Sequence, residues 1–340
     1  MEIRDVLNKV VSCHDLTEDE MVQVMEEIMA GNATPAQIAG LLIALRMKGE
    51  TLDEITAAVK VLRRLSESVP VDIPDLVDTC GTGGDGLKTF NISTTAAFVV
   101  AAAGAHVAKH GNRSVSSVSG SADVLEAAGV NLGIKPEQVA ECIEKTGVGF
   151  MFAPLHHSAM RHVVGPRREM GVRTLFNILG PLTNPAGAKN QVIGVFDRKW
   201  MEPMASVLNR LGSRHVLLVH SEEGLDEVSI SGQTFVCELK EGQINTYTVR
   251  PESFSMQAQP IEGLVVNTAE ESLNIMKGVL SGHLDGAARD IVALNAGAAL
   301  YVAGKTENWQ KGVDEARVLM QSGKPMRVLQ SLVELTGSMS

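Results

Sequence analysis

Basic residues are the minority charge in this chain of 340 residues, and their shortage limits the partners that it can bind. The sequence contains 40 acidic and 30 basic residues, a formal net charge of −10 at pH 7. Nucleic acids and anionic membranes both attract proteins through a basic face. We therefore expect no nucleic-acid partner and no membrane partner, whereas an anionic small molecule can still bind where positive charge is concentrated locally.

Long apolar runs and paired cysteines are missing too. The longest apolar stretches, 96–105 and 296–303, are too short to cross a bilayer as a helix. The four cysteines lie far apart without a Cys-x-x-Cys pair, which favours reduced thiols in a cytosolic protein. The first residues read as a helix rather than as a signal peptide, so we expect a cytoplasmic protein.

Aromatic residues are scarce, at 4% of the chain, while Gly and small aliphatic residues are abundant. Such side chains suit helices that pack closely on a parallel sheet. A charged content of 21% suits an ordered globular core rather than a disordered chain. The length allows two domains, or one large domain with a small one appended.

The first 70 residues carry the pattern of four short amphipathic helices. Apolar residues recur there at helical spacing, and helix-start signals lie at 17–20, at Thr34-Pro35 and at 51–54. We predict a small helical domain at residues 1–70, joined by helices from about 158–185. It carries no phosphate-binding signature.

After a short linker with two prolines, strands alternate with helices, which indicates a mostly parallel sheet. We predict an α/β domain at residues 75–340 with a mostly parallel central sheet and C-terminal helices at 270–335. Ligands of such sheets bind beyond the C-terminal ends of the strands, so the loops that follow these ends should converge. The parallel strands are predicted at 76–80, 106–109, 148–152, 191–196 and 215–220, and hairpin-like strands at 227–230, 234–239 and 244–249.

Two neighbouring loops within residues 76–129 combine glycines with serines. The first loop, 81–86, has the sequence GTGGDG and follows the first strand, and the second, from His110, has the sequence HGNR followed by a serine-rich run. Glycine lets the backbone approach a ligand closely, and successive N–H groups at a helix start favour anions. Lys109 and Arg113 add positive charge, so we predict a ligand with two separated phosphate groups. The spacing fits neither the Walker A motif nor the dinucleotide fingerprint.

These segments resemble a known family over nearly the whole chain. The runs GTGGD, TFNIST, VAKHGNRSVSS and GSADVLEAAG, with FAPLHHSAMRHVVGPRREMGVRT and LGPLTNP downstream, are similar to those of the anthranilate phosphoribosyltransferases, of the nucleoside-phosphorylase-like class. The resemblance implies transfer of the phosphoribosyl group of 5-phosphoribosyl-1-pyrophosphate (PRPP) to the amino group of anthranilate, with release of diphosphate, in tryptophan biosynthesis. It also implies Mg²⁺, as two ions, and a homodimer formed through the helical domain.

The resemblance places the donor PRPP on both loops and on the helix starts that follow them. Which loop takes the 5-phosphate and which the pyrophosphate is not decided by the sequence. The donor-binding residues that it implies are Gly81, Gly84, Asp85, Thr89, Asn91, Ile92, Ser93, Thr94, Lys109, His110, Gly111, Asn112, Arg113, Ser114, Val115, Ser116, Ser117 and Ser121.

A carboxylate pair, Asp226 and Glu227, follows the strand at 215–220. Carboxylates are hard oxygen ligands that suit Mg²⁺, which is usually held by one or two of them together with substrate phosphates and water. An exposed Asp-Glu pair can equally be a solvated turn. The resemblance favours the metal role and adds Ser93 as a further ligand.

The carboxylate of anthranilate needs a cation. Arg167 lies in a segment rich in arginine, and a guanidinium matches a carboxylate with two hydrogen bonds; Arg161, Arg168 and Arg173 are alternatives. The resemblance implies that Gly81, Asn112 and Arg167 contact the acceptor.

No residue stands out as a general base. His110 and His156 lie in suggestive loops, but a lone histidine is more often a structural hydrogen-bonding group. Because an aromatic amine is already neutral at pH 7, we expect catalysis by positioning and electrostatics, with Lys109 and Arg167 the most important residues.

Two other functions fit parts of the pattern. A pyrimidine nucleoside phosphorylase shares the architecture and a glycine-rich phosphate loop, but Asn112 with Arg167 and the Asp226-Glu227 pair favour the transferase. A non-catalytic nucleic-acid-binding relative would need a basic surface, which the excess of acidic residues opposes.

Overall fold

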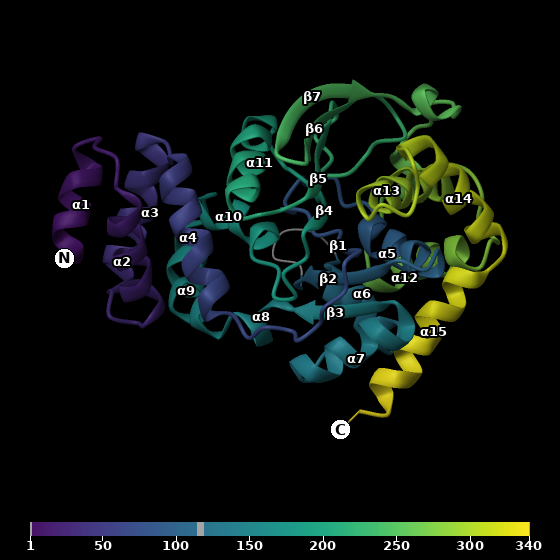
Figure 1. Cartoon of the computed structure of the whole chain (residues 1–340), viewed down its shortest axis with the longest axis horizontal. Coiled ribbons are helices and arrows are strands. Elements are labelled where there is room, and N and C mark those ends of the chain that lie inside the picture. The colour runs from purple at the N-terminus through teal and green to yellow at the C-terminus, as the bar shows by residue number, and fades with distance from the viewer. Residues whose placement is uncertain (1, 114–118, 340) are drawn as a thin grey trace.

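A bundle of helices at the N-terminal end adjoins a larger part that is built on one seven-stranded sheet (Figure 1). The computed structural model describes residues 2–113 and 119–339. This architecture confirms the predicted fold class, a helical part followed by an α/β part with C-terminal helices. In the described residues, no helix is both long enough and apolar enough to span a membrane.

The four predicted N-terminal helices are present, and three of them begin at their predicted signals. In the capping box before α2, Thr17 Oγ1 accepts a hydrogen bond from the Glu20 N–H, and the Glu20 carboxylate accepts one from the Thr17 N–H at 2.8 Å. The apolar faces of these helices share one core with two later helices, which pack against α2, α3 and α4. The six helices are α1 (Ile3–Val11), α2 (Glu18–Met29), α3 (Pro35–Lys48), α4 (Leu52–Leu65), α9 (Arg161–Met170) and α10 (Phe176–Leu179).

The sheet has the strand order β3-β2-β1-β4-β5-β6-β7. The first five strands in this order are parallel, β6 is antiparallel to β5, and β7 is antiparallel to β6. The chain runs outward from β1 to β3 and then returns to the other side of β1 as β4. The strand order therefore reverses between β1 and β4, where open α/β sheets bind ligands. The strands are β1 (Leu76–Asp78), β2 (His106–Gly111), β3 (Val148–Phe152), β4 (Asn190–Gly194), β5 (His215–Ser221), β6 (Thr234–Lys240) and β7 (Gln243–Val249).

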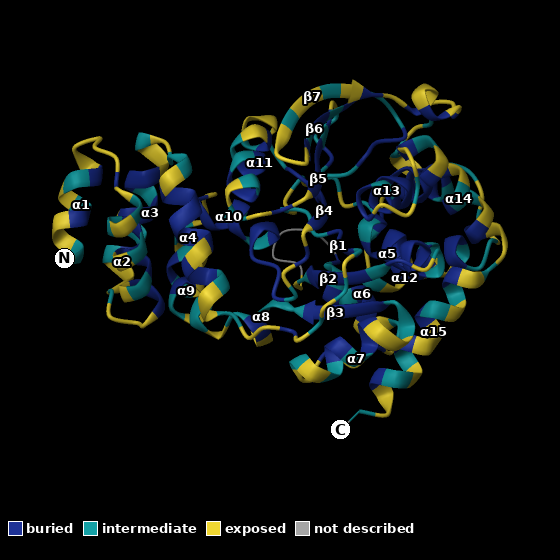
Figure 2. Ribbon diagram, viewed as in Figure 1, coloured by how far each residue is buried: buried dark blue, intermediate teal, exposed yellow. Residues whose placement is uncertain are grey.

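Helices cover both faces of the sheet. One face packs against α5 and α13, with α12, α14 and α15 behind them, and the other packs against α11, which also contacts α4. Alternate strand residues enter different cores, as Val192 and Ile193 do, so the buried positions form two layers (Figure 2). The remaining elements are α5 (Ile92–Ala102), α6 (Ser121–Ala127), α7 (Pro136–Thr146), α8 (Ala153–His156), α11 (Met201–Arg210), α12 (Ala269–Leu280), α13 (Ala287–Val302), α14 (Trp309–Gln321) and α15 (Lys324–Gly337), with 3₁₀ turns at Ser158–Met160, Gly180–Leu182, Arg198–Trp200, Pro251–Phe254 and Glu262–Leu264.

The predicted strand at 227–230 is wrong. The N–H of Val228 donates to Asn295 Oδ1, and Asn295 Nδ2 donates to the Val228 carbonyl, each at 3.0 Å. A side-chain amide on α13 thus takes the place of a neighbouring strand. The segment crosses the end of the sheet instead of joining it.

Several strand ends also differ from the prediction by one or two residues, as at β4, which spans Asn190–Gly194 and not 191–196. β1 ends at Asp78, and the carbonyl of Thr79 accepts a hydrogen bond from Lys109 Nζ at 2.8 Å. β2 continues to Gly111, because His110 and Gly111 still pair with β3. The second loop therefore begins further along the sheet edge than the sequence suggested.

Candidate active site

The glycine loop 81–86 lies at the reversal of strand order. Gly83, Gly84 and Gly86 have φ values of 66°, 78° and 80°, a region that only glycine enters freely. Thr82 N donates to the carbonyl of Gly194, the last residue of β4, at 2.8 Å. The loop is therefore fixed across the ends of β1 and β4, with Gly83 and Gly84 exposed.

Asp226 and Glu227 close one side of this loop. Asp226 Oδ2 accepts a hydrogen bond from Gly83 N at 2.8 Å, and Glu227 Oε1 accepts one from Ser93 N, at the start of α5, at 3.1 Å. Both acidic residues are half-buried. The first loop and the acidic segment therefore converge as expected, and the acidic pair faces the glycine loop and not bulk solvent.

Gly194 makes this approach possible, and sequence reasoning missed it. A Cβ on Gly194 would lie 1.5 Å from the carbonyl oxygen of Asp226. The available signal was a glycine at the C-terminal end of a predicted strand, next to the expected site.

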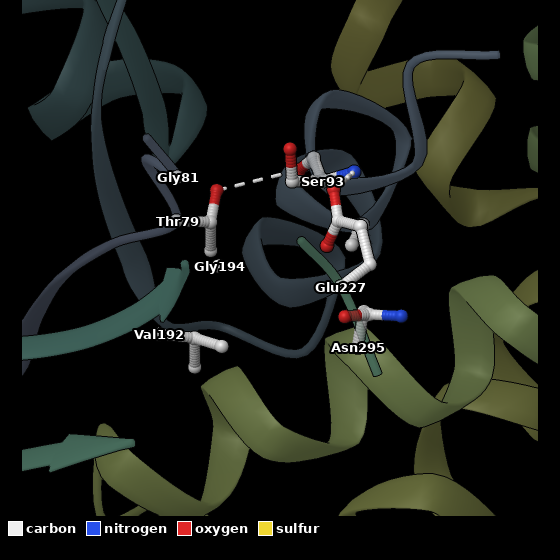
Figure 3. Close-up of a pocket in the computed structure, with 8 residues that line it drawn as sticks. Thr79, Gly81, Ser93, Val192, Gly194, Glu227 and Asn295 are labelled. Atoms are coloured by element: carbon white, nitrogen blue, oxygen red, sulfur yellow. Dashed lines mark hydrogen bonds between the residues drawn. The ribbon is translucent and has the colours of Figure 1, made fainter. Parts of the chain in front are cut away.

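A small cavity of about 10 Å³ lies beneath the loop, with room for about one water molecule. Figure 3 shows Glu227 close to Ser93 and above Asn295. The cavity is lined by Thr79, Gly81, Ser93, Ala96, Val192, Gly194, Glu227 and Asn295.

The two carboxyl groups are difficult to ionise as a pair. Burial raises the pKa of Asp226, and the charge of Asp85 raises it further. Burial also raises the pKa of Glu227, with a further contribution from the charge of Asp226. A divalent cation would stabilise the ionised pair.

The donor set fits Mg²⁺. Asp226, Glu227 and the Ser93 hydroxyl offer hard oxygen atoms, and among residues 2–113 and 119–339 no group of three or more His, Cys, Asp or Glu side chains is arranged to hold a metal ion. Mg²⁺ is typically held by one or two carboxylates and completes its shell with substrate phosphates and water. The residues present therefore match a Mg²⁺ site whose remaining ligands come from the substrate phosphates and water.

Lys109 provides positive charge at the floor of the site. Its side chain is 4% exposed, and Nζ donates to the Thr79 carbonyl and to Thr79 Oγ1, with Ser93 Oγ 3.4 Å away. Asp78 is buried nearby, and burial raises the pKa of its carboxyl to about 6. Asn184 Nδ2 donates to Asp78 at 2.7 Å. Lys109 is thus held rigidly between the first loop and the start of α5.

The segment at the start of α5 is used partly for structure. Asn91 Oδ1 accepts hydrogen bonds from Ser119 Oγ and Ser272 Oγ, so its side chain ties the two loops to α12. Ile92 and Thr94 are buried, and the N–H of Ile92 donates to the Phe90 carbonyl at 2.7 Å.

Two further predicted donor residues hold the loop itself. Asp85 Oδ1 accepts from Leu87 N at 3.1 Å, and Thr89 forms an isolated bridge with Val265.

The second loop is described only as far as Arg113. Asn112 and Arg113 are exposed, and the Arg113 guanidinium pairs with Glu126 at 2.7 Å and with Asp123 at 3.2 Å, both on α6. Gly111 has no room for a Cβ, which would lie 2.1 Å from Ser121 Oγ. Four residues predicted to bind the donor lie outside the described residues, namely Ser114, Val115, Ser116 and Ser117.

Of the four arginines considered for the acceptor, Arg167 has the most suitable surroundings. It is half-buried on α9, 5.5 Å from the Phe176 ring, and no acidic group lies within 4 Å of it among the residues described. Burial lowers the pKa of its guanidinium. Arg173, in contrast, donates to the Gly84 carbonyl, and Arg161 and Arg168 are exposed.

The histidines form a buried cluster. His110 is 4% exposed, and its ring lies 5.1 Å from that of His157, which sequence reasoning missed although it stands in the FAPLHH run. Burial, together with the neighbouring His157 and His156, lowers the pKa of His110 to about 3. His156 Nδ1 lies 2.8 Å from the carbonyl of Glu67. His156 is therefore a structural hydrogen-bonding group, and His110 is neutral at pH 7.

Comparisons with known proteins cover both parts of the chain. Residues 4–66 match the helical bundle domain of the glycosyl transferase family, and residues 73–326 match the a/b domain of that family. The anthranilate phosphoribosyltransferase of Thioalkalivibrio sulfidiphilus is 59% identical over 338 residues, which covers 99% of this chain and 100% of the relative.

Solved structures agree with this assignment. The crystal structure of anthranilate phosphoribosyltransferase from Thermus thermophilus is 44% identical, with a TM-score of 0.93 over 98% of this chain and 100% of that one. The Saccharomyces cerevisiae enzyme in complex with PRPP and Mg is 26% identical, with a TM-score of 0.90 over 99% of this chain and 98% of that one. On its sequence and its fold, the chain belongs to the anthranilate phosphoribosyltransferases of the glycosyl transferase family.

Proposed function

We propose that this chain transfers the phosphoribosyl group of PRPP to the amino group of anthranilate, which gives N-(5-phosphoribosyl)anthranilate and diphosphate in tryptophan biosynthesis. One observation carries the proposal: the glycine loop, the start of α5, Lys109 and the Asp226-Glu227 pair converge at the reversal of strand order. This arrangement suits a sugar with phosphate groups at both ends. Family membership supports the same reaction.

The residues of the site act mainly on the donor. The exposed glycine backbone offers hydrogen bonds to phosphate oxygens, and the positive end of the α5 dipole favours their negative charge. Lys109 adds a fixed positive charge close to Ser93. Because these groups are already oriented, they stabilise the charge that develops on the leaving diphosphate without further rearrangement.

Asp226 and Glu227, with the Ser93 hydroxyl, would hold Mg²⁺. When bound, the ion neutralises and orients the diphosphate. The yeast relative was solved with PRPP and Mg, and we propose two ions here. The hydrogen bonds of the two carboxylates to Gly83 and Ser93 place their oxygen atoms beside both binding segments.

Arg167 binds the carboxylate of anthranilate, together with Asn112 and the backbone of Gly81. Its guanidinium is half-buried without an acidic partner in the described part of the chain, so an incoming carboxylate would pair with it. His110, which is neutral at pH 7, adds no competing charge. The amine attacks as the neutral form, so positioning takes the place of a general base.

The helical part supports assembly into a homodimer. Four of its apolar residues are between 43% and 83% exposed. They are Val11 on α1, Met47 on α3, Val164 on α9 and Val172 just after α9. Covering such side chains with a second copy removes them from water. We propose a cytoplasmic homodimer.

The test is continuous fluorescence of anthranilate with purified protein. We expect the signal to fall only when PRPP and Mg²⁺ are both present. Thymidine or uridine with inorganic phosphate serves as the alternative substrate pair, and turnover of that pair without loss of anthranilate would overturn the proposal.

A further inference from the structure

We propose that Asn295, on α13, is a positioning residue for the acidic pair, and that it sets the affinity of the site for Mg²⁺ and PRPP. The inference rests on the proposed function. It assigns to a buried amide in the C-terminal helices a role in the site that lies next to it. Asn295 is 3% exposed, and its amide makes its hydrogen bonds to backbone groups of the protein.

The acidic segment has no strand to hold it. Asp226 and Glu227 follow β5, but residues 225–229 belong to none of the strands that the structure describes, and only the Leu225 carbonyl accepts a backbone hydrogen bond from β5, from Ser221 N at 3.0 Å. Buried side chains take over the backbone hydrogen bonds instead: Ser221 Oγ accepts from Leu225 N at 2.9 Å, and Thr234 Oγ1 accepts from Ser229 N at 3.0 Å. The position of the acidic pair therefore depends on a few side chains.

Asn295 makes the central contacts of this set. Its Oδ1 accepts from Val228 N and its Nδ2 donates to Val228 O, both at 3.0 Å, while Nδ2 also donates to Ile291 O at 2.9 Å. The N–H of Val228 belongs to the peptide group that leaves Glu227, so this contact fixes the orientation of the Glu227 backbone. The third hydrogen bond anchors the amide to its own helix, so α13 sets the position of the two contacts with Val228. We call these two contacts of Asn295 the clamp.

The clamp lies directly under the site. Asn295 and Glu227 line the same small cavity as Ser93, and Figure 3 shows the amide below the Glu227 side chain. Glu227 Oε1 is held on its other side by Ser93 N. Glu227 is thus located from α5 by its side chain and from α13 by its backbone. Loss of the second restraint frees the carboxylate to leave the position that a metal ion needs.

Residues that orient metal ligands without touching the metal typically change its affinity by about 10–100-fold when they are replaced. We therefore expect Asn295→Ala to raise the Mg²⁺ concentration for half-maximal PRPP binding by about 10-fold or more. The KM for anthranilate should change little, because Arg167 lies on α9, in the helical part. Replacing a residue that only supports the fold would not weaken Mg²⁺-dependent PRPP binding while leaving the KM for anthranilate unchanged.

The experiment measures binding of PRPP by calorimetry as a function of Mg²⁺, without anthranilate, so that no turnover occurs. Asn295→Asp tests the same point with a side chain of equal size, which can accept from Val228 N but cannot donate to Val228 O. Val292→Ala is the matched control, since Val292 is equally buried on α13 and is one turn away from the clamp. Thermal melts identify a temperature at which every variant is folded. If one of the Asn295 variants is unfolded at all temperatures, Asn295→Ser takes its place.

A shift in Mg²⁺ dependence in the Asn295 variants, without one in Val292→Ala, supports the inference. Unchanged Mg²⁺ dependence in the folded Asn295 variants overturns it, as does an equal shift in the control. Failure of the unaltered protein to bind PRPP in Mg²⁺ is a different outcome, because it overturns the proposed function itself.

Discussion

Replacement of Gly194 by alanine tests the geometry of the site most directly. The new Cβ would lie 1.5 Å from the carbonyl oxygen of Asp226, whereas real Cβ atoms essentially never come within 3.0 Å of a neighbour. Either the oxygen or β4 must therefore move by roughly 1.5 Å. The backbone that has to move carries the proposed metal ligands, and β4 is buried along its length.

A misplacement of about 1 Å can cost about 100-fold in rate. We expect Gly194→Ala to lower kcat/KM for PRPP by about 100-fold or more and to raise the Mg²⁺ concentration needed for activity. Overpacking should also destabilise the fold by about 1–3 kcal/mol. The KM for anthranilate should change much less than the KM for PRPP.

The assay is the fluorescence of anthranilate at varied PRPP and Mg²⁺, with urea denaturation to confirm folding. Gly337→Ala is the control, because Gly337 lies at the end of α15 without a positive φ, and no atom of the described residues comes within 4 Å of its would-be Cβ. A folded Gly194→Ala protein with the Mg²⁺ dependence and kcat/KM of the unaltered protein would refute the reasoning, since the acidic segment would then not depend on contact with β4.

Three further changes test other parts of the site. Arg167→Ala should raise the KM for anthranilate about 10–100-fold, because hydrogen bonds to charged groups contribute about 1.5–3 kcal/mol; an effect confined to the KM for PRPP would contradict this. Glu126→Gln should loosen Arg113, which keeps its pairing with Asp123, and strengthen PRPP binding in calorimetry by at most about fivefold, since exposed ion pairs contribute about 0–1 kcal/mol, and weaker binding would count against a donor role for Arg113. Because burial lowers the pKa of His110 to about 3, its neutral ring contributes stability that is complete above pH 6.5 and is lost as the pH falls towards 3. Between pH 6.5 and 4.5, the free energy of unfolding measured with urea should therefore fall less steeply in His110→Asn than in the unaltered protein, by about 1.4 kcal/mol per pH unit. Equal slopes for the two proteins would exclude this contribution.

Local signals in the sequence predicted most of the fold. The threonine caps at 17–20, 34–37 and 51–54 start helices because each satisfies backbone donors within the same turn. The apolar strand runs are likewise local, so the order of elements and the convergence of the loops could be predicted. These features need no information from distant parts of the chain.

The errors all arose from contacts between distant residues. Residues 227–230 read as a strand, because nothing nearby indicates that Asn295 will take the backbone hydrogen bonds of Val228. The need for glycine at 194 depends on the later passage of Asp226 over the end of β4. The pairing of Arg113 with Glu126 depends on how α6 turns back towards the loop. Spacing within one motif contains none of this information.

The hydrogen bonds between Asn295 and Val228 also bear on when the protein gains its activity during synthesis. Chains emerge from the ribosome N-terminal end first, and their domains fold as units. A nascent chain of about 290 residues already contains both glycine loops, Lys109 and the acidic pair, but the acidic segment still lacks its anchor. Full affinity for the magnesium form of the sugar phosphate should thus arise only near the end of translation, once residue 295 has been added.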